Sequence, residues 1–353
     1  MNILFVKLGA IGDIVHTLPA LSAVRNAIPD AHISWAAERR SAEILRGNPL
    51  IDELIEIDTK SIRSRQNPDG VLNDIRTQAK GLRRNKYEVA IDFQGLLKSA
   101  AIAKISGAPR RFGFDKRSLR EPASRFLLTD TVEVRREIHV IRKNLALVAA
   151  SLGIAAPDNS FEFPIATGPE HLREAEETVA RVGPEFAILN PGGGWATKLW
   201  PAERFGELAR VLWDRHRIAS VISVGPKEEH LAEAALKRSA DARVTVANLT
   251  LKGFYELSKR ASLYVGGDTG PTHLAAAADT PIVGLFGPTE WWRNGSPNPH
   301  DVCVERLDIG CRTDCHRRRC SNWICMDIPF ETVARAASAR LGLTVPSGRE
   351  VVA

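Results

Sequence analysis

The chain of 353 residues has no apolar run near the ~18 residues needed to cross a bilayer. Its start, "MNILFVK", looks like a short strand and has neither the charged region nor the cleavage site of a signal peptide. Long internal repeats and low-complexity tracts are absent as well. We therefore expect a globular, cytoplasmic protein.

Signatures of several common ligands are also missing. No zinc-finger or RNA-recognition motif occurs, so we expect no nucleic-acid partner. The first glycine-rich loop has the spacing G-x-x-G-D, at Gly9 and Gly12, rather than the G-x-G-x-x-G of dinucleotide sites, which disfavours a nicotinamide cofactor. The net charge of +6 still indicates an anionic partner, either a phosphorylated substrate or a phospholipid surface.

Cysteine is absent from the first 302 residues, and all five cysteines lie between Cys303 and Cys325. Four of them follow the spacing C-x3-C-x4-C-x4-C in "CRTDCHRRRCSNWIC": Cys311, Cys315, Cys320 and Cys325. Four thiolates could close a structural zinc or iron site. The alternative is a set of free thiols around a surface loop. His316 could replace one ligand or belong to a basic surface.

Apolar strand patterns alternate with helical patterns in both halves of the chain. This predicts an α/β fold of two Rossmann-like domains with parallel sheets, facing each other across a cleft. We expect domains at 1–160 and 161–335, the second including the Cys-rich segment 303–325, then a tail at 336–353. The Pro- and Gly-rich stretch 153–170 is the expected linker. The predicted strands are 3–6, 33–36, 53–57, 89–93, 186–190, 219–224, 263–265 and 281–286; helical patterns include 18–27, 201–215 and 228–239.

The loop "KLGAIGD" follows the first strand and ends in an acidic residue, Asp13. Asp13 could be the N-cap of the next helix, which aspartate does well. It could also be a general base that takes a proton from a substrate hydroxyl. In either role its negative charge makes this loop a poor phosphate site.

A second loop, "YVGGDTGPTHLAAAA" at 264–278, suits a diphosphate better. It runs from a strand through Asp268, Thr269 and Gly270 into a helix that Pro271 can start. Free amides and the positive end of the helix dipole favour phosphate there. His273, in the first turn, could donate to a phosphate oxygen or simply pack.

Two further loops after strands hold charged residues. In "NPGGGWATKLWPAERF", Lys198 lies between three glycines and a helix start, as a surface lysine or as a clamp for a leaving phosphate. In "SVGPKEEHLAEA", Glu228 or Glu229 follows a strand end. Either acid could complement the helix dipole or hold ribose hydroxyls.

Together these motifs resemble the ADP-heptose:lipopolysaccharide heptosyltransferases of glycosyltransferase family 9, which are inverting GT-B enzymes. The matching stretches are "KLGAIGDIVHTLPAL", "IDFQGLLKSA", "REPAS", "KLWPAERF" and "GDTGPTHLAAA", in order over about residues 1–300. Those of the first domain look most like the branch that adds the first heptose to the Kdo of the inner core.

The resemblance implies a role for each matching position. Asp13 is then the catalytic base, and Lys198 supports the departing diphosphate. The ADP-sugar contacts fall at Thr197, Glu228 or Glu229, Asp268, Thr269, Gly270 and His273. The acceptor contacts fall at Lys7, Gln94, Lys98 and Arg120. No cofactor is required for catalysis when a helix N-terminus and a lysine already balance the leaving charge.

The implied function is transfer of heptose from ADP-heptose to a Kdo/inner-core acceptor. Basic stretches at 60–65 and 110–125 are either solvated surface or attract the anionic glycolipid and the cytoplasmic face of the inner membrane. Two alternatives stay open: a heptosyltransferase of the same fold with a protein or other glycan acceptor, and a non-catalytic nucleotide-sugar-binding protein in which Asp13 is only a cap. The Cys-rich segment leaves the acceptor unsettled.

Overall fold

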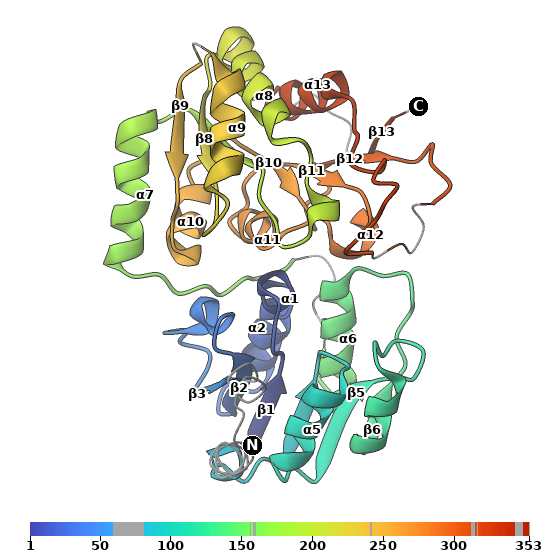
Figure 1. Ribbon diagram of the computed structural model, residues 1–353. Coiled ribbons are helices and arrows are strands. Elements are labelled where there is room, and N and C mark those ends of the chain that lie inside the picture. The colour runs from blue at the N-terminus through green and yellow to red at the C-terminus, as the bar shows by residue number, and fades with distance from the viewer. Residues whose placement is uncertain are drawn as a thin grey trace, which may run out of the picture. The chain divides into compact units, whose positions relative to one another are not determined.

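The computed structural model describes residues 1–58, 81–155, 157, 160–240, 242–311, 315, 317–342 and 349–352. The chain divides into two compact units, Met1–Ala166 and Thr167–Ala353, each built on its own sheet (Figure 1). The basic stretch 60–65 and His316 lie outside the described residues. None of the described helices is long and apolar enough to span a membrane.

Unit 1 contains a six-stranded parallel sheet in the order β3-β2-β1-β4-β5-β6. The strands are β1 (Asn2–Val6), β2 (His32–Glu38), β3 (Glu53–Ile57), β4 (Val89–Asp92), β5 (Arg110–Phe114) and β6 (Asp130–Val132). The helices are α1 (Ile11–Val15), α2 (Leu18–Ala27), α5 (Leu97–Ile105) and α6 (Val140–Leu152), with 3-10 turns η1 (Ala42–Leu45) and η2 (Pro122–Leu127). The strand order reverses between β1 and β4, the position where ligands collect in such sheets.

Strand β1 is apolar along its length because both of its faces are covered. Leu4 and Val6 pack in one core cluster with Ile102 and Ala103 of α5. Helices α2 and α6 pack against each other (Figure 1). A strand buried on both faces appears in sequence as a continuous apolar run rather than an alternating one.

Unit 2 contains a seven-stranded sheet in the order β13-β12-β11-β10-β7-β8-β9. The strands are β7 (Phe186–Asn190), β8 (Ala219–Ser223), β9 (Val244–Ala247), β10 (Leu263–Gly267), β11 (Ile282–Phe286), β12 (Val302–Arg306) and β13 (Arg349–Val352). The helices are α7 (Pro169–Val182), α8 (Ala202–His216), α9 (Glu229–Ser239), α10 (Leu251–Ser258), α11 (Gly270–Ala277), α12 (Trp291–Asn294) and α13 (Phe330–Leu341), with η3 at Ala196–Lys198. This order reverses between β7 and β10.

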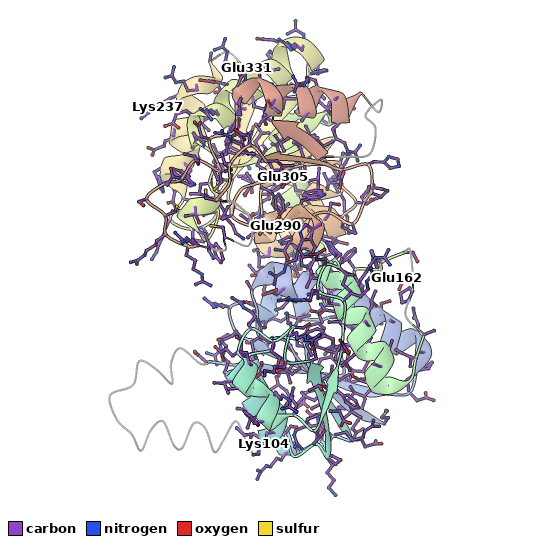
Figure 2. All side chains as sticks on the ribbon, turned by 90° about the vertical axis from the view of Figure 1, so that its right-hand side faces the viewer. Lys104, Glu162, Lys237, Glu290, Glu305 and Glu331 are labelled. Carbon is purple, nitrogen blue, oxygen red and sulfur yellow. The ribbon has the colours of Figure 1, made fainter. Side chains whose placement is uncertain are left out.

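Close packing in unit 2 brings its helices and loops into fixed positions. Helix α8 approaches α9 at Gly206, where a Cβ atom would lie 1.9 Å from the Ala235 carbonyl oxygen. The buried Trp200 donates from Nε1 to the Ile328 carbonyl at 2.9 Å, which anchors the end of the loop holding Lys198. In Figure 2, Lys237 on α9 points outward, whereas Glu305 on β12 lies in the interior. The predicted α/β class with two parallel sheets is confirmed.

Candidate active site

Asp13 lies in α1, directly after the loop that follows β1. It is the third residue of the helix and not its N-cap, a position that Ala10 occupies. Its Oδ2 accepts a hydrogen bond from the Ala10 amide at 3.0 Å, so the carboxylate still satisfies a free N–H at the helix start. The side chain is 36% exposed, which leaves the carboxylate accessible to a ligand as well.

Lys7 and Gln94 stabilise the loop between β1 and α1 through hydrogen bonds inside unit 1. The buried Lys7 ammonium donates to the Phe93 carbonyl at 2.9 Å and lies 3.7 Å from Asp13 Oδ1. Gln94 Oε1 accepts from the amides of Leu8 at 3.2 Å and Gly9 at 3.4 Å. Because these side-chain atoms are engaged inside unit 1, the structure gives both residues a part in positioning the loop.

Lys98 and Arg120, the other two expected acceptor contacts, are placed differently. Lys98 Nζ lies 3.3 Å from Glu38 Oε1, at the end of β2. Glu38 could not be predicted as the partner of Lys98, because the two residues are 60 positions apart and no local pattern links them. Arg120 is exposed and has no ion-pair partner among the described residues. Its neighbour Glu121 donates its amide to the Gly95 carbonyl, which places Arg120 beside the turn after Gln94.

A fully buried carboxyl, Asp92, organises the turn after β4. Its Oδ1 accepts from the amides of Gln94 at 2.9 Å and Gly95 at 3.3 Å, and its Oδ2 accepts from Ser99 Oγ at 3.0 Å. Burial raises the pKa of Asp92 to about 6, although these hydrogen bonds and the charge of Lys7 act in the opposite direction. The turn that presents Gln94 to the Asp13 loop therefore depends on one buried acid.

In unit 2, Lys198, Asp268 and His273 meet after β7 and β10. Lys198 Nζ lies 2.6 Å from Asp268 Oδ2, and His273 Nε2 lies 3.1 Å from Asp268 Oδ1. Burial alone would raise the pKa of Asp268, but the hydrogen bond from His273 and the charge of Lys198 outweigh it and hold this pKa far below its ordinary value. The cluster thus contains an acid that is ionised at neutral pH, with cationic or polar donors on both oxygens.

Helix α11 begins beside this cluster, with Thr269 as its N-cap and Gly270 as its first residue. Thr272 donates its hydroxyl proton to the Gly267 carbonyl and accepts a hydrogen bond from Tyr264 Oη at 2.9 Å, which fixes the first turn on β10. The first amides of a helix have no partner inside it and attract anions. The predicted loop and helix start are both present.

Glycines let the loops of unit 2 approach one another closely. A Cβ on Gly193 would lie 2.7 Å from the Thr269 methyl group, and one on Gly192 would lie 2.1 Å from Glu228 Oε2. Glu228 accepts from the amides of Gly193 at 2.9 Å and Gly225 at 2.8 Å, so it joins two loops. Glu229 is exposed and accepts the Lys227 amide at 3.3 Å.

The Cys-rich segment contacts the loop that holds Lys198. Thr197 Oγ1 donates to the Arg317 carbonyl at 2.7 Å, and Trp323 Nε1 donates to the Thr197 carbonyl at 3.2 Å. The Lys198 ammonium lies 4.4 Å from the centre of the Trp195 ring. Trp195 could not be predicted as a site residue, because an aromatic residue in a Gly-rich loop has no signal that distinguishes it from a packing residue.

The four clustered cysteines line one small cavity, together with Thr197, Pro288, Arg317 and Asn322. Burial raises the pKa of the Cys325 thiol, and the other three cysteines add to that effect. Within the described part of the chain, however, no group of three or more His, Cys, Asp or Glu residues is arranged to hold a metal ion. The metal centre expected from the cysteine spacing is therefore not formed by these side chains as they stand.

Comparison with known proteins places the chain in a family. Residues 75–323 match the model of glycosyltransferase family 9 (heptosyltransferase). Lipopolysaccharide heptosyltransferase 1 of Pseudomonas aeruginosa is 30% identical over 82% of this chain and 79% of its own length, and that of Escherichia coli K12 is 28% identical over 82% and 89%. The solved structure of E. coli heptosyltransferase WaaC with ADP-2-deoxy-2-fluoro heptose is 27% identical, covers 82% of this chain and 90% of its own, and has a TM-score of 0.70. The chain therefore belongs to glycosyltransferase family 9, the heptosyltransferases.

Proposed function

We propose that this enzyme moves heptose from ADP-heptose to a Kdo/inner-core lipopolysaccharide acceptor, with inversion at the anomeric carbon. The observation that carries the proposal is the cluster of Lys198, Asp268 and His273 beside the start of α11, at the strand-order reversal of unit 2. Such a site suits a nucleotide diphosphate. The names of the relatives, and the ADP-heptose analogue bound to WaaC, specify the sugar.

On the donor side, the amides of Thr269 and Gly270 and the ammonium of Lys198 would contact the diphosphate. Asp268 and His273 would hold Lys198 and the helix start in place. For the ribose contact we propose Glu228 rather than Glu229, because Glu228 faces the glycine loops whereas Glu229 points to solvent. Thr197, engaged with Arg317, would support the lysine from its neighbouring position.

On the acceptor side, the half-exposed Asp13 would be the general base. Lys7 and Gln94 would act by positioning its loop, and Lys98 and Arg120 would supply positive charge for an acidic sugar. In the reaction Asp13 takes the proton from the acceptor hydroxyl, whose oxygen forms the new bond to the anomeric carbon. The bond from that carbon to the diphosphate oxygen breaks, and ADP leaves with the electron pair. Lys198 and the helix amides balance its charge without a cofactor.

The test is transfer from ADP-heptose to Kdo2-lipid A by the purified protein and by Asp13→Asn. We expect the variant to lose transfer by at least roughly a hundredfold, in keeping with removal of a general base, while it binds ADP as the unchanged protein does. Asp30→Asn, which neutralises an exposed acid of unit 1, is the matched control. ADP binding without transfer to this acceptor would favour a protein or other glycan acceptor, or a non-catalytic binding protein. Full transfer by Asp13→Asn would remove the base from the mechanism.

We also propose peripheral contact with the cytoplasmic face of the inner membrane, where a glycolipid acceptor would be anchored. Support comes from Phe126, which is 79% exposed and follows Arg125 in η2. It also comes from the exposed cations of this stretch that have no ion-pair partner among the described residues, namely Lys116, Arg117, Arg120 and Arg125. Anionic lipids attract such a surface in a salt-dependent way. Binding to anionic vesicles that falls with added salt and with Phe126→Ala is the expected result; equal binding to neutral vesicles would refute it.

For the Cys-lined cavity we propose one structural zinc or iron(II) ion. The support is that all four sulfur-bearing side chains reach the same small space, and thiolates are ligands that both metals accept. The side chains would have to turn toward one another on binding. Metal analysis of protein purified without an affinity-tag metal should find about one ion per chain. A content well below that would end the proposal.

A further inference from the structure

The positive charge of the proposed donor site is largely compensated by its own carboxylates. The charge of Lys198 is already paired with Asp268, at 2.6 Å and with both side chains mostly buried. Glu228 adds a negative charge at the neighbouring loops. With His273 left out of the sum, Lys198, Asp268 and Glu228 together carry one net negative charge. ADP-heptose itself carries more than one negative charge, and the diphosphate gains another when ADP leaves. A further cation would add to the attraction that Lys198 and the amides of α11 supply.

The structure offers that cation on the Cys-rich segment. The guanidinium carbon of Arg318 lies 4.9 Å from the centre of the Trp195 ring, the same ring that the Lys198 ammonium contacts at 4.4 Å. Two cations therefore share one indole. Arg318 is exposed and, unlike Lys198, has no carboxylate partner among the described residues. Within the described part of the chain, Arg318 is therefore the uncompensated charge of the pair.

The backbone that presents Arg318 is tied to the same loop. Its neighbour Arg317 accepts the Thr197 hydroxyl at 2.7 Å through its carbonyl oxygen, and Trp323 donates to the Thr197 carbonyl at 3.2 Å. Thr197 immediately precedes Lys198, so one hydrogen bond joins the residue before Lys198 to the residue before Arg318, and a second joins it to Trp323. A surface arginine without such ties would have no fixed relation to the donor loops.

We propose that Arg318 is a second cation for the donor diphosphate, held against Trp195 beside Lys198. The inference rests on the proposed function. Each of the two cations attracts an anion bound next to the Trp195 ring, and the two attractions add. Arginine also fits phosphate with two parallel hydrogen bonds and stacks well on indole, which makes it better suited to this place than a second lysine. The Cys-rich segment then contributes directly to donor binding.

The test is calorimetric titration of ADP and AMP into the full chain and into three variants. For Arg318→Ala we expect ADP binding to weaken by about tenfold, and AMP binding, with one phosphate fewer, by much less. Arg318→Lys should recover part of the loss, because it restores charge without the bidentate geometry. Arg319→Ala removes an equal charge from the adjacent exposed residue and should bind ADP like the unchanged protein.

Unchanged ADP affinity in Arg318→Ala would overturn the inference, and so would an equal loss of ADP and AMP binding or an equal loss in Arg319→Ala. Melting temperatures of all variants separate lost binding from lost folding, and Arg318→Lys keeps the test valid if the alanine variant is unstable. The outcome is distinct from failure of the proposed function, in which the unchanged protein itself would not bind ADP.

Discussion

Lys198 and Asp268 form a buried ion pair in which the ammonium reaches both the carboxylate at 2.6 Å and the main-chain carbonyl of Asp268 at 3.0 Å. The lysine follows β7 and the aspartate follows β10, the two neighbouring strands at the order reversal of the sheet. The Lys198 side chain thus joins the loop after β7 to the loop after β10. The pair has two consequences, for stability and for donor binding.

Lys198→Met should destabilise the fold as well as impair transfer. It leaves the Asp268 carboxylate buried with a missing partner, which typically costs about 3–5 kcal/mol of unfolding free energy. Urea unfolding measures this. The control is Arg260→Met, which breaks the exposed pair with Glu176 and should cost less than about 1 kcal/mol. Equal small losses in both variants would show that the buried pair is no more important than a surface one.

Glu228→Gln and Glu229→Gln should behave differently although the residues are adjacent. Glutamine has one carbonyl oxygen, so at position 228 it can accept only one of the Gly193 and Gly225 amides. Its NH2 group then faces the other amide, which is also a donor, and this should lower the unfolding free energy by about 1–3 kcal/mol. We expect lower stability and weaker ADP binding for this variant. At the exposed position 229 the change should stay within about 0.5 kcal/mol. Equal effects at the two positions would argue against the ribose assignment.

The fold could be predicted where both faces of a strand are covered. Strands β1 and β7 appear in the sequence as continuous apolar runs, and their loops gave the positions of Asp13 and Lys198. Strand β5 was not predicted, because it starts with Arg110 and Arg111 and so lacks an apolar beginning. Apolar periodicity reports burial, and a strand with polar ends shows too little of it.

The partners within the site could not be predicted. Lys98 meets Glu38 across 60 residues, and Thr197 meets Arg317 across 120, with no local pattern to link either pair. Asp13 was predicted at a helix start but its place as third residue, with Ala10 as N-cap, depends on how the glycine loop turns. The spacing of the four cysteines predicted that they lie in one cluster. Spacing alone does not determine whether their sulfur atoms point toward one another.

Gln94→Leu should slow transfer without weakening ADP binding. The change leaves the amides of Leu8 and Gly9 without their shared acceptor, a cost of about 1–3 kcal/mol that falls on the loop holding Asp13. We expect kcat to fall by about tenfold, since small displacements of a base are costly. ADP titration provides the internal control because unit 2 is untouched. A parallel loss of ADP affinity would mean that the defect is general unfolding.

Asp92 should give the fold a pH dependence opposite to that of an ordinary ion-paired carboxylate. Its pKa is raised to about 6 in the fold, against 3.8 in an exposed chain, so between these values the folded protein keeps a proton that the unfolded chain releases. Its contribution to stability is therefore complete below about pH 4 and is lost as the pH rises to about 6. A shift of about two pKa units corresponds to roughly 3 kcal/mol of unfolding free energy.

Asp92→Asn isolates this contribution. Asparagine keeps an oxygen for the Gln94 and Gly95 amides and can donate from its nitrogen to Ser99, so the turn survives. Other acids, such as Asp268, have lowered pKa values and stabilise the fold as the pH rises, so only the difference between the two proteins is informative. Urea unfolding from about pH 4 to about pH 7 should show the unchanged protein losing roughly 3 kcal/mol relative to Asp92→Asn. Parallel curves would mean that Asp92 titrates in the fold as it does in water, and that the turn behind the Asp13 loop is insensitive to its charge.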